Sequence, residues 1–173
     1  MTLARFARAC SLAAILVTPL AALADDYADV NQLARQGKHE QALAKADQYL
    51  QAKPRDPQMR FLKGVIEAES GKRTEAIATY TQLTQEYPEL PEPYNNLAVL
   101  YAQDGDYDKA RQSLEGAVRA NPNYATAYEN LGDVYAKLAS QSYAKAQQIE
   151  PANAGAASKL ALVKQLLSAP QKR

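Results

Sequence analysis

The chain of 173 residues carries 20 lysines and arginines against 19 aspartates and glutamates, which gives a formal net charge of +1. This balance lacks the basic surface that nucleic-acid binding requires. One cysteine and one histidine exclude a disulfide framework and a cysteine–histidine zinc site, and they leave little for a nucleophile–histidine pair. We therefore expect no enzyme activity, no cofactor, no metal and no nucleic-acid partner.

Residues 1–24 have the features of a secretory signal peptide. Arg5 and Arg8 form a positive start, an apolar stretch follows, and Ala22-Leu23-Ala24 fits the cleavage pattern before Asp25. The stretch is too short for a permanent transmembrane helix, although a retained anchor is the alternative. We expect a mature chain that is periplasmic or secreted in a Gram-negative bacterium, without stable membrane insertion.

A period of 34 residues runs through the remaining chain. Three residue types share it, namely Gly37, Gly71 and Gly105; Ala42, Ala76 and Ala110; and Pro54, Pro88 and Pro122. Self-similarity at a fixed period predicts stacked units rather than one closed core.

Each unit reads as a pair of helices. Tyr94, Leu97 and Tyr101 fall at the three-to-four spacing of one helical face, and Gly105 predicts the turn that follows. A second apolar face begins at Ala110, whose small side chain indicates a close approach of the two helices. Neither helix can bury its apolar face alone, so the units must stack.

These residues resemble the pattern of the tetratricopeptide repeat family. The third unit reads Tyr94-x-x-Leu97-Ala98-x-x-Tyr101, then Ala110-x-x-x-Leu114 and Pro122, and the fourth reads Tyr128-x-x-Leu131-Gly132-x-x-Tyr135, then Ala139-x-x-x-Tyr143 and Pro151. The second unit departs, because its first helix has Arg60, Lys63 and Glu67 in place of the aromatic, Leu and Tyr. The resemblance implies an all-α fold, a right-handed α-α superhelix of about 3.5–4 stacked hairpins with a C-terminal capping helix.

The expected segments follow the period. They are a partial unit at 25–54, whole units at 55–88 and 89–122, a shortened unit at 123–151, a capping helix at 152–168 and a frayed tail at 169–173. The cap is expected to start at Asn153, to bury a stripe of Leu160, Val163, Leu166 and Leu167, and to have a polar outer face.

The fourth unit lacks five residues at its turn. Tyr135 and Ala139 are four residues apart, whereas Tyr101 and Ala110 are nine apart. Either a tight turn lies near Ser140, or the two helices fuse into one of about 25 residues, roughly 37 Å long. The absence of Gly and Pro between Gly132 and Pro151 favours fusion.

Acidic residues around Asp104-Gly105-Asp106-Tyr107-Asp108 resemble a calcium loop in spacing. The sixth place of such a loop needs glycine, and here it is Lys109. We therefore expect a solvated turn in which Asp106 caps the next helix, and no calcium site.

In the family, the first helix of each hairpin lines a concave groove that holds an extended peptide or a partner helix. The resemblance places thirteen residues in this groove: Phe61, Leu62, Val65, Glu69, Glu92, Asn95, Asn96, Val99, Gln103, Glu129, Asn130, Asp133 and Lys137. Asn96 and Asn130 are expected to stack one unit apart, to face solvent and to bond a peptide main chain. The alternative is that this face is only solvated surface.

Some family members clamp a C-terminal carboxylate with cations in this groove, and the resemblance implies no such clamp here, because the matching positions hold Tyr27, Asn31, Asn96, Glu92 and Asn130. The groove positions run instead from apolar residues near Phe61 to acidic ones at Glu92, Glu129 and Asp133. This mixture suits a peptide with apolar residues at one end and a basic residue at the other.

The resulting expectation is an exported, non-enzymatic scaffold that binds a protein or peptide partner in envelope assembly or cell-wall complexes. The alternative is a self-associating homo-oligomer, which the exposed apolar stripe of a shortened first unit would favour. An enzyme on a helical scaffold is the least favoured reading.

N-terminal sequencing of the exported protein tests the signal peptide. We expect Asp25 as the first residue, because Ala24 ends the small-residue cleavage pattern. An intact Met1 on the exported protein would contradict cleavage.

Overall fold

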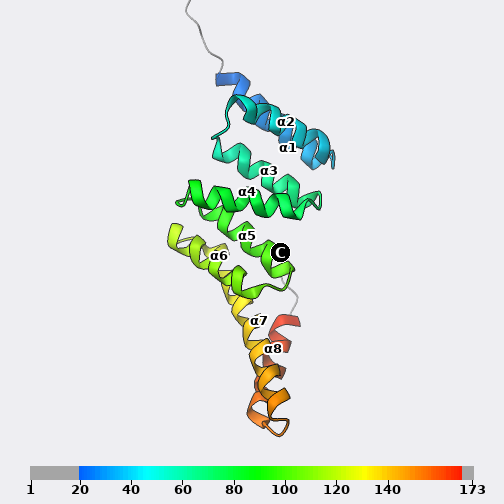
Figure 1. Cartoon of the computed structure of the whole chain (residues 1–173), viewed down its shortest axis with the longest axis vertical. Coiled ribbons are helices and arrows are strands. Elements are labelled where there is room, and N and C mark those ends of the chain that lie inside the picture. Colours follow the sequence, from blue (N-terminus) through cyan, green and yellow to red (C-terminus); the bar gives the residue numbers. More distant parts are fainter. Residues whose placement is uncertain (1–19, 169–173) are drawn as a thin grey trace, which may run out of the picture.

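A computed structural model describes residues 20–168, which form eight α-helices and no strand. The helices are α1 (Leu20–Arg35), α2 (His39–Ala52), α3 (Pro57–Glu69), α4 (Arg73–Glu86), α5 (Pro91–Gln103), α6 (Tyr107–Ala120), α7 (Ala125–Ile149) and α8 (Ala154–Ser168). Figure 1 shows them stacked in chain order along one long axis. The expected all-α array of stacked helix hairpins is confirmed.

Part of the expected export segment lies beyond this description. Residues 1–19 and the tail 169–173 are outside the described residues, and the predicted cleavage site after Ala24 falls within α1. Among the helices of residues 20–168, none combines the length and the hydrophobicity needed to cross a bilayer.

The first three hairpins turn at the periodic glycines. Gly37, Gly71 and Gly105 have φ angles of 72°, 78° and 76°. A residue with a Cβ is strained in this conformation, which explains why the turn requires glycine. After Gly37, the amide of Lys38 donates to the carbonyl of Leu33 at 3.0 Å, and this bond closes the end of α1.

The first unit of the described chain consists of two packed helices, α1 and α2, whereas the sequence predicted a partial unit over residues 25–54. α1 begins at Leu20, and Val30 on it is fully buried in a cluster with Ala42 and Ala46 of α2. Helix α1 starts before the predicted cleavage site after Ala24, because Leu and Ala, which make a leader apolar, are also good helix formers. The apolar stripe expected to be exposed on the first unit, around Tyr27, Val30 and Leu33, therefore packs in this cluster.

Asp56 ties the first hairpin to the second. It caps α3 by accepting from the amides of Gln58 and Met59 at 3.0 and 3.2 Å. Its two carboxylate oxygens also accept from the hydroxyls of Tyr27 on α1 and Tyr49 on α2, at 2.6 and 2.7 Å. Burial alone would raise the pKa of Asp56, but these hydrogen bonds outweigh it and hold the pKa below its usual value.

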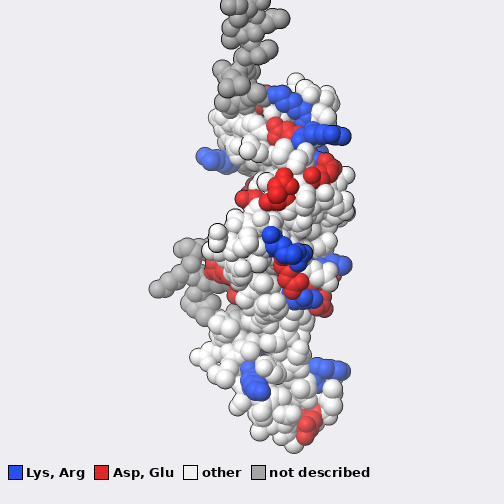
Figure 2. All heavy atoms as spheres, turned by 90° about the vertical axis from the view of Figure 1, so that its left-hand side faces the viewer, with Lys and Arg blue, Asp and Glu red and all other residues white. Residues whose placement is uncertain are grey.

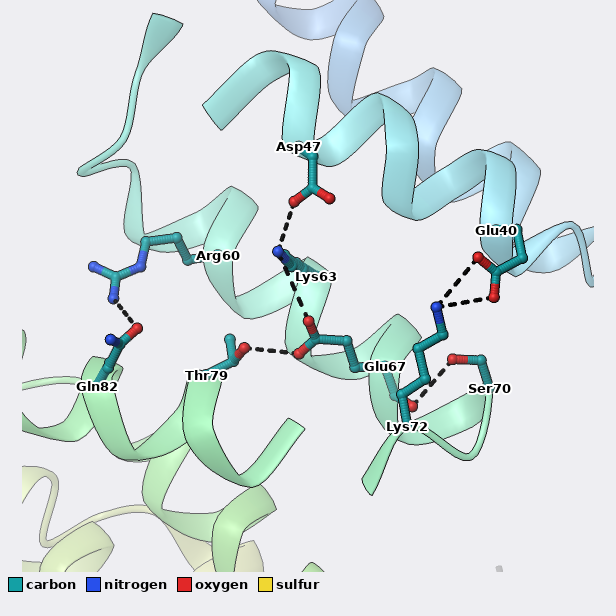
Figure 3. A network of polar contacts seen from close by, with 9 residues as sticks. All are labelled: Glu40, Asp47, Arg60, Lys63, Glu67, Ser70, Lys72, Thr79 and Gln82. Atoms are coloured by element: carbon teal, nitrogen blue, oxygen red, sulfur yellow. Dashed lines mark hydrogen bonds and ion pairs between the residues drawn. The ribbon is translucent and has the colours of Figure 1, made fainter. Parts of the chain in front are cut away.

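The second hairpin joins its helices with polar contacts. Glu67 of α3 is buried and accepts from the hydroxyl of Thr79 on α4 at 2.7 Å, and Lys63 lies 3.8 Å from its other oxygen (Figure 3). Arg60 reaches across to Glu86 at 2.7 Å. The three residues that depart from the family pattern thus form polar links where the other units use apolar contacts.

Close approach of paired helices depends on small residues. Ala76 and Ala110 have no exposed surface, as expected. A Cβ added at Gly116 of α6 would lie 2.5 Å from the ring of Tyr94 on α5, so no larger residue fits there without movement.

The fourth unit contains one continuous helix. α7 has 25 residues and runs from Ala125 to Ile149 without a reversal at Ser140, so helix fusion is confirmed. α8 turns back and packs along α7 at the far end of the stack (Figure 1).

The capping helix α8 differs from the prediction in the exposure of its leucines. Asn153 caps α8 by accepting from the amide of Ala156 at 2.9 Å, and Leu160 is buried, both as expected. Leu166, assigned to the buried stripe, is 64% exposed, and Leu162 is 65% exposed. The expected polar outer face is therefore wrong, because α7 covers only one side of α8 and these leucines lie away from it.

Replacing Ala110 by Leu tests the hairpin register. The larger side chain must enter a fully buried contact, so we expect a loss of about 1–3 kcal/mol in the free energy of unfolding, measured by chemical denaturation. The matched change Gln112→Leu places the same side chain at an exposed site on the same helix and should be nearly silent. Equal effects of the two changes would show that the register is wrong.

Lowering the pH tests the Asp56 contacts. The folded-state pKa of Asp56 lies below its unfolded value, so its contribution is present above about pH 4 and is lost as the pH falls through the folded-state pKa. We expect the free energy of unfolding to fall more steeply below about pH 4 in the wild type than in Asp56→Asn. Parallel curves for the two proteins would contradict this assignment.

Candidate peptide-binding groove

Two adjoining hollows run along the first helices of the second, third and fourth units. One of about 380 Å³ lies between α5, α6 and α7, and the other, of about 280 Å³, lies between α3, α4 and α5. Val99 and Gln103 line both, so the two hollows are neighbours along α5, and together they form what we call the groove.

Eight of the thirteen expected residues line the groove. They are Val65, Glu69, Asn96, Val99, Gln103, Asn130, Asp133 and Lys137. They come from α3, α5 and α7, which is the side of the stack that the resemblance implied.

The other five lie elsewhere. Phe61 and Glu92 line a third hollow of about 320 Å³ at the N-terminal ends of α3 and α5. Leu62 packs against the core of the first hairpin, and Asn95 is buried at 6% exposure. Glu129 is exposed but lines none of these three hollows.

The asparagines of the groove bond within the protein. Asn130 donates to the side-chain oxygen of Asn95 at 2.8 Å, and Asn96 donates to the hydroxyl of Tyr80 at 3.1 Å. A longer contact of 3.5 Å joins Asn95 to Asn96. The expectation that Asn96 and Asn130 stack directly on each other is therefore wrong, because Asn95 contacts both. The two side chains are half-buried and line the hollows, and they are bonded within the protein rather than free in solvent.

The groove asparagines keep part of their bonding capacity. An amide side chain offers two donors and an acceptor, and these contacts use only part of that set. Each amide is thus held in place while retaining groups that a peptide main chain could meet.

Tyr80 is a groove residue that sequence reasoning missed. Its ring is 1% exposed and lies 5.8 Å from the ring of Phe61, as expected for a core position. Its side chain nevertheless lines the smaller hollow. Burial and the carboxylates of Glu67 and Glu69 raise the pKa of Tyr80 to about 12, so the hydroxyl stays protonated and can donate.

The charges along the stack are mixed. Figure 2 shows basic and acidic side chains interspersed on one face, without a continuous patch of one sign. In the acidic turn, Arg73 pairs with Asp104 at 2.8 Å, and Asp106 caps α6 by accepting from the amide of Lys109, as expected. Over residues 20–168, no three metal-ligating side chains gather into a metal site.

Solved structures with the same fold include several helical repeat proteins. The chain matches the MamA protein with a TM-score of 0.60 at 20% identity, over 82% of this chain and 80% of that one. It matches the Yersinia enterocolitica type III secretion chaperone SycD, solved in complex with a peptide of the translocator YopD, with a TM-score of 0.61 at 18% identity, over 67% and 94%. YrrB, described as a TPR protein with an unusual peptide-binding site, matches with a TM-score of 0.55 at 23% identity, over 60% and 54%.

Family models give the more specific result. No curated protein sequence matches the chain significantly. Two models, both described as tetratricopeptide repeat, match residues 27–91 and 67–138. Together these matches run from residue 27 to residue 138, and the chain belongs to the tetratricopeptide repeat family.

Proposed function

We propose that this protein is a non-enzymatic binding module that holds an extended segment of a partner protein in the groove. The observation that carries the proposal is that two neighbouring hollows, which share Val99 and Gln103, extend over three units. An extended peptide rises about 3.3 Å per residue, so a groove of this kind meets several consecutive residues of one chain.

The groove offers complementary contacts for such a segment. Val65 and Val99 supply apolar surface, and Val99 is 39% exposed with its side chain in both hollows. The half-buried amides of Asn96 and Asn130 supply groups for a peptide main chain. The contacts of the amides within the protein orient these groups before a ligand arrives, which lowers the entropic cost of binding.

Glu69 gives the groove a preference for a basic residue. It is exposed, and it lies in the smaller hollow beside Val65 and Val99. We propose that the bound segment pairs an apolar side chain for the valines with a lysine or arginine for this carboxylate.

The likeness to peptide-bound structures supports the proposal at the level of the fold. SycD holds a peptide of YopD, and PcrH, another match, was solved with the chaperone binding region of PopD. We extend the proposal to the cell envelope on the strength of the signal-like residues 1–24, with partners in envelope assembly or cell-wall complexes.

Peptides selected from a random library for binding to the wild-type protein test this function. We expect Val99→Glu to lower the affinity for a selected peptide at least tenfold, a loss of about 1.4 kcal/mol or more in binding free energy measured by titration calorimetry. The reason is that the change places a charge on the apolar surface that both hollows share. The fold should be unaffected, since Val99 is partly exposed.

Gln112→Glu is the matched control, because it adds the same carboxylate at an exposed position on α6 that lines neither hollow. It should bind the selected peptide like the wild type. Equal weakening by both changes, or by neither, would place the binding site outside the groove.

A further inference from the structure

The first half of α7 has a packing face that none of the helices in residues 20–168 covers. Tyr128, Gly132 and Tyr135 repeat, one period later, the residues with which α5 packs against α6. On α5 this face is closed, and Ala98 at its centre is 1% exposed. On α7, Tyr128 is 49% and Tyr135 48% exposed, and a Cβ at Gly132 would meet nothing within 4 Å.

The second half of α7 corresponds in sequence to α6, the second helix of the third unit. Ala139, Tyr143 and Ala146 occupy the places that Ala110, Leu114 and Ala117 have on α6. α6 is a middle helix that packs on α5 with one side and on α7 with the other.

In the second half of α7, only one of the two corresponding sides packs against another described helix, which is α8. Tyr143 is half-buried toward α8, with the ammonium of Lys159 5.7 Å from its ring centre. The other side corresponds to the α6 side that carries Gly116 against Tyr94. Its residues Ser142 and Lys145 are exposed, and Ile149 is 73% exposed.

Both open faces lie on the same side of one continuous helix. Tyr128, Tyr135, Ser142 and Ile149 are spaced by seven residues, and this spacing keeps side chains nearly in line along a helix. Gly132 and Ala139 lie between them as small residues that permit close approach. Because the turn is missing, the two halves of this hairpin interface cannot fold onto each other.

We call this line of side chains on α7, from Tyr128 to Ile149, the stripe. We infer that a second copy of this chain covers the stripe, with the two α7 helices antiparallel. The first half of each α7 then packs on the second half of the other, and α8 of each copy extends the array of the other. A two-fold axis near the middle of α7 completes two hairpin interfaces at once, as an isologous contact requires.

Charge favours the antiparallel arrangement. The register of Tyr94 against Gly116 brings Tyr128 of one copy beside Lys145 of the partner subunit, whose ammonium can lie on the ring. Because Lys145 is larger than Gly116, the two α7 helices lie further apart than α5 and α6 do. A parallel pair would instead place like charges together. Figure 2 shows charged side chains more sparsely spread toward the α7–α8 end than in the middle of the stack.

Sedimentation equilibrium of the purified protein tests this interface. We expect a dimer for the wild type and a monomer for Gly132→Glu, which places a charged side chain at the centre of the stripe. The helix should persist by circular dichroism, because Glu is a better helix former than Gly. Ala144→Glu is the matched control, since Ala144 is exposed and lies nine residues from Tyr135, about half a turn away, so it should remain dimeric.

A wild-type monomer, or a Gly132→Glu dimer, would overturn the inference. Val99→Glu, which blocks the groove, should leave the dimer intact, so failure of the groove proposal and failure of this one can be told apart.

Cysteine cross-linking tests the direction of the pair. In a Cys10→Ser background, the double variant Tyr128→Cys with Lys145→Cys should form a covalent dimer on mild oxidation. Each single variant should not, because antiparallel helices hold two copies of the same residue roughly 25 Å apart. Cross-linking of the single Tyr128→Cys variant would show a parallel pair and would contradict the proposal.

Discussion

A helix of this chain keeps its apolar side out of water only where another helix lies against it, and the order of the stack follows from that need. The distance between paired helices is set by small residues at fixed places, such as Ala76 and Ala110. Large rings then fill the space beside them, as Tyr94 does against Gly116. The groove exists because the first helices of successive units line one side of the stack, and the second helices pack against their opposite side.

The second and third hairpins reach the same geometry with different chemistry. Glu67 and Thr79 meet where the third unit has Tyr101 and Ser113. Burial raises the pKa of Glu67, which shows that placing this carboxylate there has an electrostatic cost. The bond from Thr79 and the nearby ammonium of Lys63 offset part of that cost. A polar contact between two helices requires matched hydrogen-bond donors and acceptors, whereas an apolar contact requires mainly complementary shape.

The turns and the small contact residues were predictable because backbone conformation and steric fit allow few residue types at those places. The same holds for α7, where the lack of Gly and Pro near Ser140 left a continuous helix as the simplest outcome. The start of α1 was not predictable, since a leader and a helix favour the same residues. The amide contacts of Asn96 and Asn130 were missed because they join α5 to α4 and α7 at rotamers that a linear pattern does not specify.

The unbroken α7 also changes how the array can come apart. In a solenoid of separate hairpins, an end unit can open while its neighbours remain folded. Here one helix belongs both to the third-unit core, through Val134 and Leu138, and to the α8 contact, through Tyr143. Its backbone hydrogen bonds run without interruption across that boundary. Fraying from the C-terminal end must therefore either stop within a regular helix or continue into the core. The rate of amide hydrogen exchange should then decline gradually along α7 toward its N-terminal half, without the abrupt change that a turn between two helices would cause.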